Sequence, residues 1–243
     1  MNIVQKIISW DHRPKRKVVI LVLILSAGFA IANKYIPSQH LPWRSLNPNA
    51  SVGVSTSLQL TRLSLSPSAN CESLVQKANG FRALPADPKR GPNVCGWKRA
   101  QWVNARGEAR LSPPGSPMQC PLAVGVHIWL GELDKTALNI FGEKIVKTHH
   151  AGTYSCRRQV GNSSGAWSEH AFANAWDVTG FTLESGEVIS ILKDWDGSRD
   201  KKRFLRAARN KACDIFHVTL SPDYNAAHHD HFHLDMGPTS TCR

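Results

Sequence analysis

The chain has 243 residues, with 30 Lys and Arg against 18 Asp and Glu, so its formal net charge is +12. This length suits a single domain with a substantial core. A basic balance favours an anionic partner, yet the chain carries no nucleic-acid-binding motif, so we exclude nucleic acid and expect envelope polymers or lipid head groups.

The N-terminus predicts export. Five cations and one acid lie within residues 1–17, and an uncharged run of 16 residues follows over residues 18–33. A basic flank before an apolar run keeps the flank in the cytoplasm and exports the rest of the chain. The run is short for a membrane span, but flanking lysines can extend its reach. We therefore expect residues 1–37 to form a cytoplasmic flank and a single-pass anchor in the inner membrane, with the remainder in the periplasm. Ala30-Ile31-Ala32 leaves a cleaved signal peptide open as the alternative.

Residues 38–69 combine prolines with Ser, Thr and Asn, which predicts a linker with at most one strand near Leu58–Leu65. The domain after this linker, residues 70–243, holds all six cysteines of the chain. An exported domain with an even number of cysteines predicts three disulfides. Their spacing does not select the pairing. The working assignment is Cys71–Cys95, Cys156–Cys213 and Cys120–Cys242.

The pattern of residues 71–234 mixes helices with strands and predicts an α+β domain with a mostly antiparallel sheet. The clearest helix begins at Pro121, because Pro suits the first helical turn, and runs to about Gly142. Further helices are expected over residues 71–80 and 198–213. Strands are expected over residues 97–103, 108–111, 144–148, 175–183, 187–193, 215–220 and 231–234.

Two short segments supply the side chains of a metal site. Asp177 follows His170 by seven residues, and the C-terminal segment carries His231 and His233, two residues apart. In a strand, residues two apart point to the same face, so both imidazoles can approach one site. We expect Asp177 on a strand and His170 before it on a loop or short helix. Two imidazoles, a carboxylate and an open position are typical of catalytic zinc. The His-Glu-x-x-His helix, the Cys-x-x-Cys pair and finger spacing are all absent.

The pattern Ser168-x-His170-x6-Asp177, followed by His231-x-His233, resembles the zinc peptidases related to lysostaphin, D-Ala-D-Ala carboxypeptidase and sonic hedgehog. The wider sequence is closer to the bacterial extensin-like C-terminal domain family, over roughly residues 70–243. One departure is Asn174, where many relatives carry Gly. The matching stretches are Cys95-Gly96-Trp97, Cys120-Pro121-Leu122-Ala123, Cys156-Arg157-Arg158, residues 168–177 and residues 225–235.

The resemblance implies a zinc-peptidase-like fold in which His170, Asp177 and His233 hold Zn²⁺. It implies a zinc-dependent hydrolase of peptide or amide bonds, and together with export it suggests peptidoglycan peptides as the partner. The alternative is a membrane-anchored, non-catalytic protein that binds the cell wall or has a structural role in the envelope. The complete ligand set favours the enzyme.

The resemblance also suggests catalytic residues beside the ligands. His231 stands where such enzymes place a catalytic histidine, and His228 where some hold a second functional histidine. Asp230 stands where other relatives use a Glu as general base, so the choice of base between Asp230 and His231 stays open. Arg157 or Arg158 resembles an upstream arginine that faces the substrate carbonyl.

Overall fold

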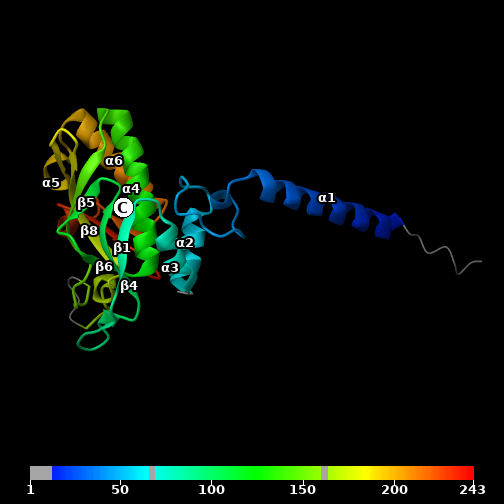
Figure 1. Ribbon diagram of the computed structural model, residues 1–243, viewed down its shortest axis with the longest axis horizontal. Helices are drawn as coiled ribbons and strands as arrows, with labels where there is room; N and C mark the ends of the chain where they lie inside the picture. The colour runs from blue at the N-terminus through cyan, green and yellow to red at the C-terminus, as the bar shows by residue number, and fades with distance from the viewer. Residues whose placement is uncertain (1–12, 66–68, 160–163) are drawn as a thin grey trace, which may run out of the picture.

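The computed structural model describes residues 13–65, 69–159 and 164–243. It shows an α+β body from which one long N-terminal helix projects (Figure 1). The first part of the basic flank, residues 1–12, lies outside the described residues. The helices are α1 (Arg13–Tyr35), α2 (Thr56–Leu65), α3 (Ala69–Lys77), α4 (Cys120–Phe141), α5 (Ile191–Asp194) and α6 (Arg199–Cys213), with short 3-10 helices η2 (Ser38–His40), η3 (Glu169–Phe172) and η4 (Ala226–His228).

The main sheet has ten strands and carries the candidate site near its centre. Eight strands lie in the order β1 (Phe81–Ala86), β4 (Ala100–Arg106), β5 (Ala109–Ser112), β7 (Ile145–Gly152), β8 (Ala175–Leu183), β11 (Phe232–Asp235), β10 (Val218–Leu220) and β12 (Thr241–Cys242). Two further strands flank this path, with β6 (Ser116–Met118) on β4 and β9 (Val188–Ser190) on β8, while β2 (Lys89–Arg90) and β3 (Gly96–Trp97) form a separate small sheet.

The sheet is mixed rather than mostly antiparallel as expected. β5 pairs with β7 in parallel, and β10 pairs with β12 in parallel, whereas the other pairs are antiparallel. A parallel pair needs a long crossover, and α4 is part of the crossover between β5 and β7. The sequence pattern predicted β5, β7 and α4. It did not predict which strands pair in the sheet, and that pairing decides whether two strands run parallel or antiparallel.

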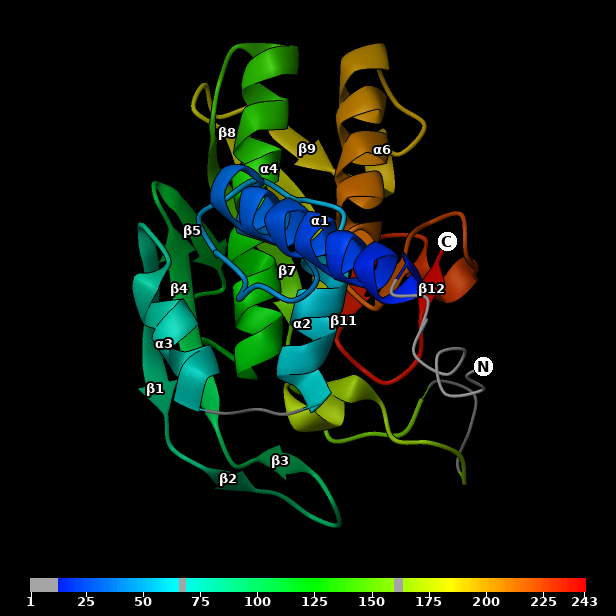
Figure 2. The same cartoon turned by 90° about the vertical axis from the view of Figure 1, so that its right-hand side faces the viewer.

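The core lies between the sheet and two helices that run side by side across it, α4 and α6 (Figure 2). Pro121 stands in the first turn of α4, and the helix ends where Gly142 adopts φ 73° and its N–H bonds to the Leu138 carbonyl. The helix α6 is amphipathic and buries Phe204, Leu205, Ala208 and Ala212, leaving its basic face toward solvent. These two helices confirm the predictions for residues 121–142 and 198–213.

Two local predictions are wrong. The strand expected near Leu58–Leu65 is the helix α2, which buries Thr56, Gln59 and Leu60 at helical spacing. Together with Leu46, Leu60 belongs to the core, so this part of the expected linker packs onto the body. The strand expected over residues 187–193 ends at Ser190, and Ile191 begins a one-turn helix with a buried side chain. In both cases tertiary packing overrides local propensity.

All three assigned disulfide pairings are wrong, although all six cysteines are paired as expected. Cys71 on α3 meets the start of α4, because these two helices pack together, while Cys95 lies beyond β1 near the small sheet. The end of α6 lies beside the last strand β12. The observed bonds are Cys71–Cys120, Cys95–Cys156 and Cys213–Cys242.

The Cys71–Cys120 bond is expected to stabilise the fold mainly by restricting the conformations of the unfolded chain. It spans 49 residues, and closing a loop of that size restricts the unfolded state by about 4 kcal/mol. We expect the paired change Cys71→Ser and Cys120→Ser to lower the free energy of unfolding by roughly that amount, measured by denaturant titration. Peptide mapping without reductant should find the three observed pairs, and detection of the Cys71–Cys95 pair would contradict the structure.

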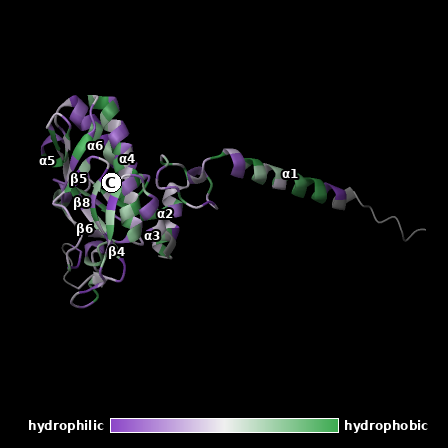
Figure 3. Ribbon diagram, in the orientation of Figure 1, coloured by the Kyte–Doolittle hydropathy of each residue, from purple (hydrophilic) through white to green (hydrophobic). Residues whose placement is uncertain are grey.

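The projecting helix α1 is apolar along its middle (Figure 3). Within the 20 residues from Arg16 to Tyr35, an 18-residue window has a mean hydropathy of 2.0, and none of that window is buried against the body. Within the described ranges, it alone is long and apolar enough to cross a membrane. A helix in this position could act as a signal sequence or as an anchor, and the three disulfides of the following domain indicate an extracytoplasmic compartment.

Candidate metal centre

Two central strands and the short helix before them bring His170, Asp177 and His233 together. Asp177 on β8 stands directly opposite His233 on β11 in the antiparallel register. Residues in such a position have adjacent side chains on one face of the sheet. His170 lies in η3, which precedes β8 as expected, and is buried with 3% of its surface exposed.

The fold of η3 aims His170 at the sheet. The Ser168 hydroxyl accepts a hydrogen bond from the His170 backbone N–H over 3.3 Å and so caps the turn. Ala173 then adopts φ 54°, a left-handed conformation that reverses the chain into β8. The Asn174 side chain donates a hydrogen bond to the Glu169 carboxylate over 2.7 Å, which stabilises this reversal of the chain. Asn174 therefore has a structural role in this chain.

Three ligand atoms converge from these residues. The His170 Nε2 lies 3.1 Å from Asp177 Oδ2 and 3.2 Å from His233 Nδ1. The His233 Nδ1 lies 2.9 Å from Asp177 Oδ1. All three ligand atoms lie within 4.8 Å of one another, a spacing that fits one shared ion. Two imidazole nitrogens and one carboxylate oxygen are a donor set that suits zinc.

A second carboxylate fixes the orientation of His233. Asp235 Oδ2 lies 2.9 Å from His233 Nε2, and Asp235 also accepts the Gly237 backbone N–H over 2.8 Å. A carboxylate on one imidazole nitrogen holds the proton there and leaves the other nitrogen free as a ligand. The donor set therefore presents His233 Nδ1, and the residues present fit a zinc ion.

The charges of the centre favour a cation. Burial raises the pKa of the Asp177 carboxyl, but hydrogen bonds from His170 and His233 outweigh it and hold that pKa well below its ordinary value. For His233 the two effects have the opposite signs. Burial lowers its pKa, but hydrogen bonds to Asp177 and Asp235 outweigh burial and raise the pKa to about 9. Without a metal, the proton held by His233 offsets part of the negative charge of the neighbouring carboxylates. A divalent ion would replace that positive charge and release protons on binding.

His231 and Asp230 form a pair at the edge of the centre. The His231 Nδ1 lies 2.7 Å from Asp230 Oδ1, and its Nε2 lies 3.7 Å from Asp177 Oδ1. The hydrogen bond to His231 lowers the pKa of Asp230. His231 thus presents Nε2 toward the ligand Asp177 and Nδ1 toward Asp230. In this arrangement Asp230 fixes the orientation of the His231 ring.

His228 lies next to both histidines. Its ring centroid is 5.2 Å from that of His231 and 6.0 Å from that of His233. Burial lowers the pKa of His228 to about 4, with a further contribution from the charges of its two neighbours. Its Nδ1 lies 2.7 Å from the Asn225 side-chain oxygen. His228 is therefore neutral at pH 7 and can donate or accept a hydrogen bond without adding charge.

A cavity of about 450 Å³ opens beside the centre and is lined by His228, His233 and Arg157. Arg158 instead stacks on Trp167, with its guanidinium carbon 4.6 Å from the ring centroid. The structure therefore places Arg157 rather than Arg158 toward the site. The remaining walls include Trp167, Tyr224, Thr239 and Thr241.

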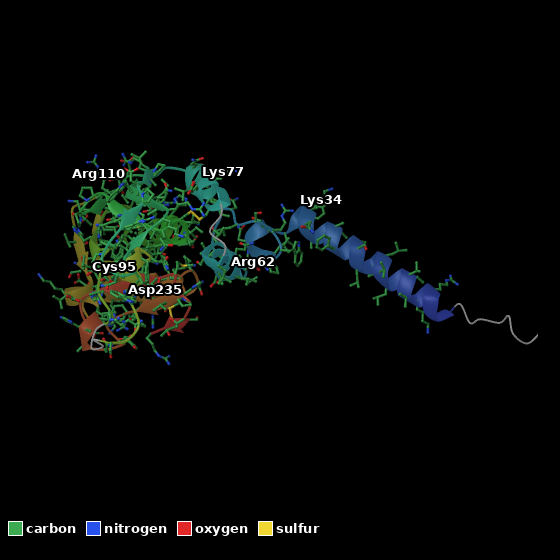
Figure 4. All side chains as sticks on the ribbon, turned by 90° about the horizontal axis from the view of Figure 1, so that it is seen from below. Lys34, Arg62, Lys77, Cys95, Arg110 and Asp235 are labelled. Atoms are coloured by element: carbon green, nitrogen blue, oxygen red, sulfur yellow. A yellow bond between two sulfur atoms is a disulfide. The ribbon has the colours of Figure 1, made fainter. Side chains whose placement is uncertain are left out.

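Sequence reasoning missed Asp235 and Tyr224. Asp235 (labelled in Figure 4) belongs to the same strand as His233 and lies two residues beyond it, so the same alternation that grouped His231 with His233 also predicts its face. Tyr224 packs against His228 with ring centroids 5.4 Å apart, on a loop whose course the sequence does not indicate.

Replacing Asp235 with asparagine should weaken zinc binding by about 10–100-fold, the usual effect of losing a carboxylate that orients a ligand imidazole. Competition with a chromogenic chelator would measure the affinity. Asp230→Asn is the matched control, because that carboxylate contacts His231 and no ligand nitrogen, and it should leave the affinity unchanged. Equal affinities for wild type and Asp235→Asn would show that the contact with His233 does not orient the ligand.

Comparison with known proteins identifies one family. A family model described as extensin-like protein C-terminus matches residues 69–243, which include the whole centre and all six cysteines. No curated protein and no solved structure matches the chain.

Proposed function

The chain belongs to the extensin-like protein C-terminus family, and from this premise we propose that it is a zinc-dependent hydrolase of peptide or amide bonds. Its proposed substrate is the peptide cross-link of peptidoglycan, reached from an anchor in the cytoplasmic membrane. The resemblance of the His-x6-Asp and His-x-His pattern to the zinc peptidases related to lysostaphin supports the reaction class.

One observation carries the proposal. Two imidazole nitrogens and a carboxylate oxygen converge within 4.8 Å. The His231–Asp230 pair stands beside the ligand Asp177, and a cavity lined by His233 opens next to the centre. A structural zinc site is closed by four protein ligands, whereas a catalytic site keeps a position open. Among the described residues, only His170, Asp177 and His233 form such a group.

When bound, zinc would supply a Lewis acid that polarises a carbonyl and makes water acidic enough to attack at neutral pH. His231 is placed to take the proton of the attacking water and to return it to the leaving nitrogen, with Asp230 holding the ring in position. Arg157 can donate hydrogen bonds to the carbonyl oxygen as negative charge develops on it. His228 can position the substrate within the cavity.

The compartment supports the substrate. The apolar helix α1 lies before the domain, and the domain is held by three disulfides, so we place the domain outside the cytoplasm and α1 in the inner membrane with the N-terminus inside. Peptidoglycan is the abundant peptide polymer in that compartment.

Digestion of purified peptidoglycan tests the proposed function. The zinc-loaded full chain should convert cross-linked muropeptides into fragments that have gained one water for each bond cut, as resolved by mass spectrometry. A chelator should stop the reaction and added zinc should restore it. Unchanged muropeptides with zinc-loaded protein would leave the non-catalytic wall-binding protein as the better interpretation.

A further inference from the structure

A second cavity, of about 550 Å³, lies between the loop of residues 43–46 and the helices α2 and α3. Three exposed cations line it, namely Arg44, Arg62 and Lys77. Leu63 and Leu74 give it an apolar wall. In the part of the chain that the structure describes, no carboxylate pairs with any of the three cations. The cavity is therefore basic, and its charge is not balanced by neighbouring groups.

The loop that forms one side of this basic cavity is held in place. The side-chain nitrogen of buried Gln59 donates to the Ser38, Leu41 and Arg44 carbonyls over 2.9, 3.1 and 2.9 Å. The Arg62 guanidinium donates to the Pro42 carbonyl. These contacts tie the loop to α2, so the cavity is formed before any ligand binds and little ordering is required on binding.

The same loop contacts the end of the apolar helix α1. The Trp43 ring lies 5.2 Å from that of Phe29, and its Nε1 donates to the Asn33 side chain over 3.1 Å. The Arg44 guanidinium donates to the same Asn33 oxygen over 3.3 Å. Trp and Tyr together with Lys and Arg at the end of an apolar helix mark the boundary between membrane and water. Trp43, Tyr35 and Lys34 fit that pattern at the end of α1.

The basic cavity lies on the side of the body that faces α1. Lys34, Arg62 and Lys77 all lie on the side from which α1 leaves, whereas Arg110 lies away from it (Figure 4). Between residues 34 and 80 the chain has four Lys or Arg and a single acid, Glu72. The basic cavity therefore opens where lipid head groups would stand if α1 crosses a membrane.

We propose that this cavity binds the phosphate head group of an anionic phospholipid from the outer leaflet of the membrane that α1 enters. Arg44, Arg62 and Lys77 neutralise the phosphate with charge-assisted hydrogen bonds. The glycerol and first methylene groups of the lipid contact Leu63 and Leu74. The bound lipid fixes how the domain is oriented on the membrane surface, and this role is independent of the proposed hydrolase activity.

Titration of the full chain in a nonionic detergent tests the proposal. The ligands are dihexanoyl-phosphatidylglycerol, dihexanoyl-phosphatidylcholine and inorganic phosphate, and calorimetry measures binding. Phosphatidylglycerol should bind at one saturable site, phosphatidylcholine should not bind, and inorganic phosphate should bind at least tenfold more weakly because it has no apolar part.

A charge-matched pair of variants makes the test specific. The triple change Arg44→Gln, Arg62→Gln and Lys77→Gln should weaken phosphatidylglycerol binding on the order of 100-fold, since each juxtamembrane cation contributes about fivefold. The triple change Lys98→Gln, Arg110→Gln and Lys147→Gln removes the same charge from exposed positions elsewhere and should retain the wild-type affinity. Equal binding by wild type and the cavity variant, equal losses in both variants, or phosphate binding as tight as phosphatidylglycerol would each overturn the proposal. Thermal unfolding of both variants checks that they are folded.

Discussion

His233→Ala is expected to abolish stoichiometric zinc binding. His233 contacts two carboxylates, Asp177 and Asp235, and its Nδ1 also lies 3.2 Å from His170 Nε2. Losing a carboxylate that only orients a ligand costs about 10–100-fold in affinity, so losing the ligand itself should cost more than that. Elemental analysis of the purified proteins, with one zinc per wild-type chain, would measure the effect.

His229→Ala is the matched control for this change. It removes an exposed imidazole from the same segment, and that imidazole contacts only the Ala226 carbonyl among the described residues. The control should keep its zinc. Equal zinc in wild type and His233→Ala would show that His233 is not a ligand, and zinc loss in His229→Ala alone would assign the ion to the exposed histidine segment.

His231→Ala is expected to keep its zinc and to lose activity by at least about 10²-fold, the effect of removing a general acid–base group. Zinc binding and activity should separate because His231 is not one of the three candidate ligands. Its Nε2 instead lies 3.7 Å from the ligand Asp177. The measurement is the turnover of a cross-linked muropeptide, together with the zinc content of the same sample.

The comparison with Asp230→Ala decides which residue is the base. Asp230 contacts His231 Nδ1 over 2.7 Å, so its loss should disturb the ring and reduce turnover less than the loss of the ring itself. A larger loss in Asp230→Ala would make the carboxylate the base. Loss of zinc in His231→Ala would instead make His231 a ligand.

Local patterns predict the parts of the fold that depend on neighbours in sequence. Pro121 and the apolar run after it predict α4, because the start of a helix and its buried face depend on residues within the helix itself. The spacing of His231 and His233 predicts a shared face for the same reason, and both imidazoles do approach Asp177. The three candidate ligands could be named because the family resemblance carries their spacing.

Features that depend on distant packing could not be predicted. The parallel pairing of β5 with β7, and the pairing of Cys71 with Cys120 and of Cys213 with Cys242, follow from how α3, α4 and α6 lie against the sheet. The Cys95–Cys156 bond joins two loops that are far apart in sequence. The segment of α2 resembles a strand in sequence because Leu58 and Leu60 alternate with polar residues, although burial of Gln59 and Leu60 against the body selects a helix. Tyr224 enters the site from a loop, and no periodic pattern indicates a loop's course.

The most direct test of the proposed enzyme is a zinc titration of the metal-free full chain, followed by counting new amino groups released from cross-linked muropeptides. Activity should rise in proportion to added zinc and reach its plateau at one zinc per chain, because one group of three ligands serves the reaction. Asp177→Asn should stay inactive at the same zinc concentration, since it lacks the only anionic ligand. Full activity of the metal-free wild type, or no amino-group release at any zinc concentration, would contradict a zinc-dependent hydrolase.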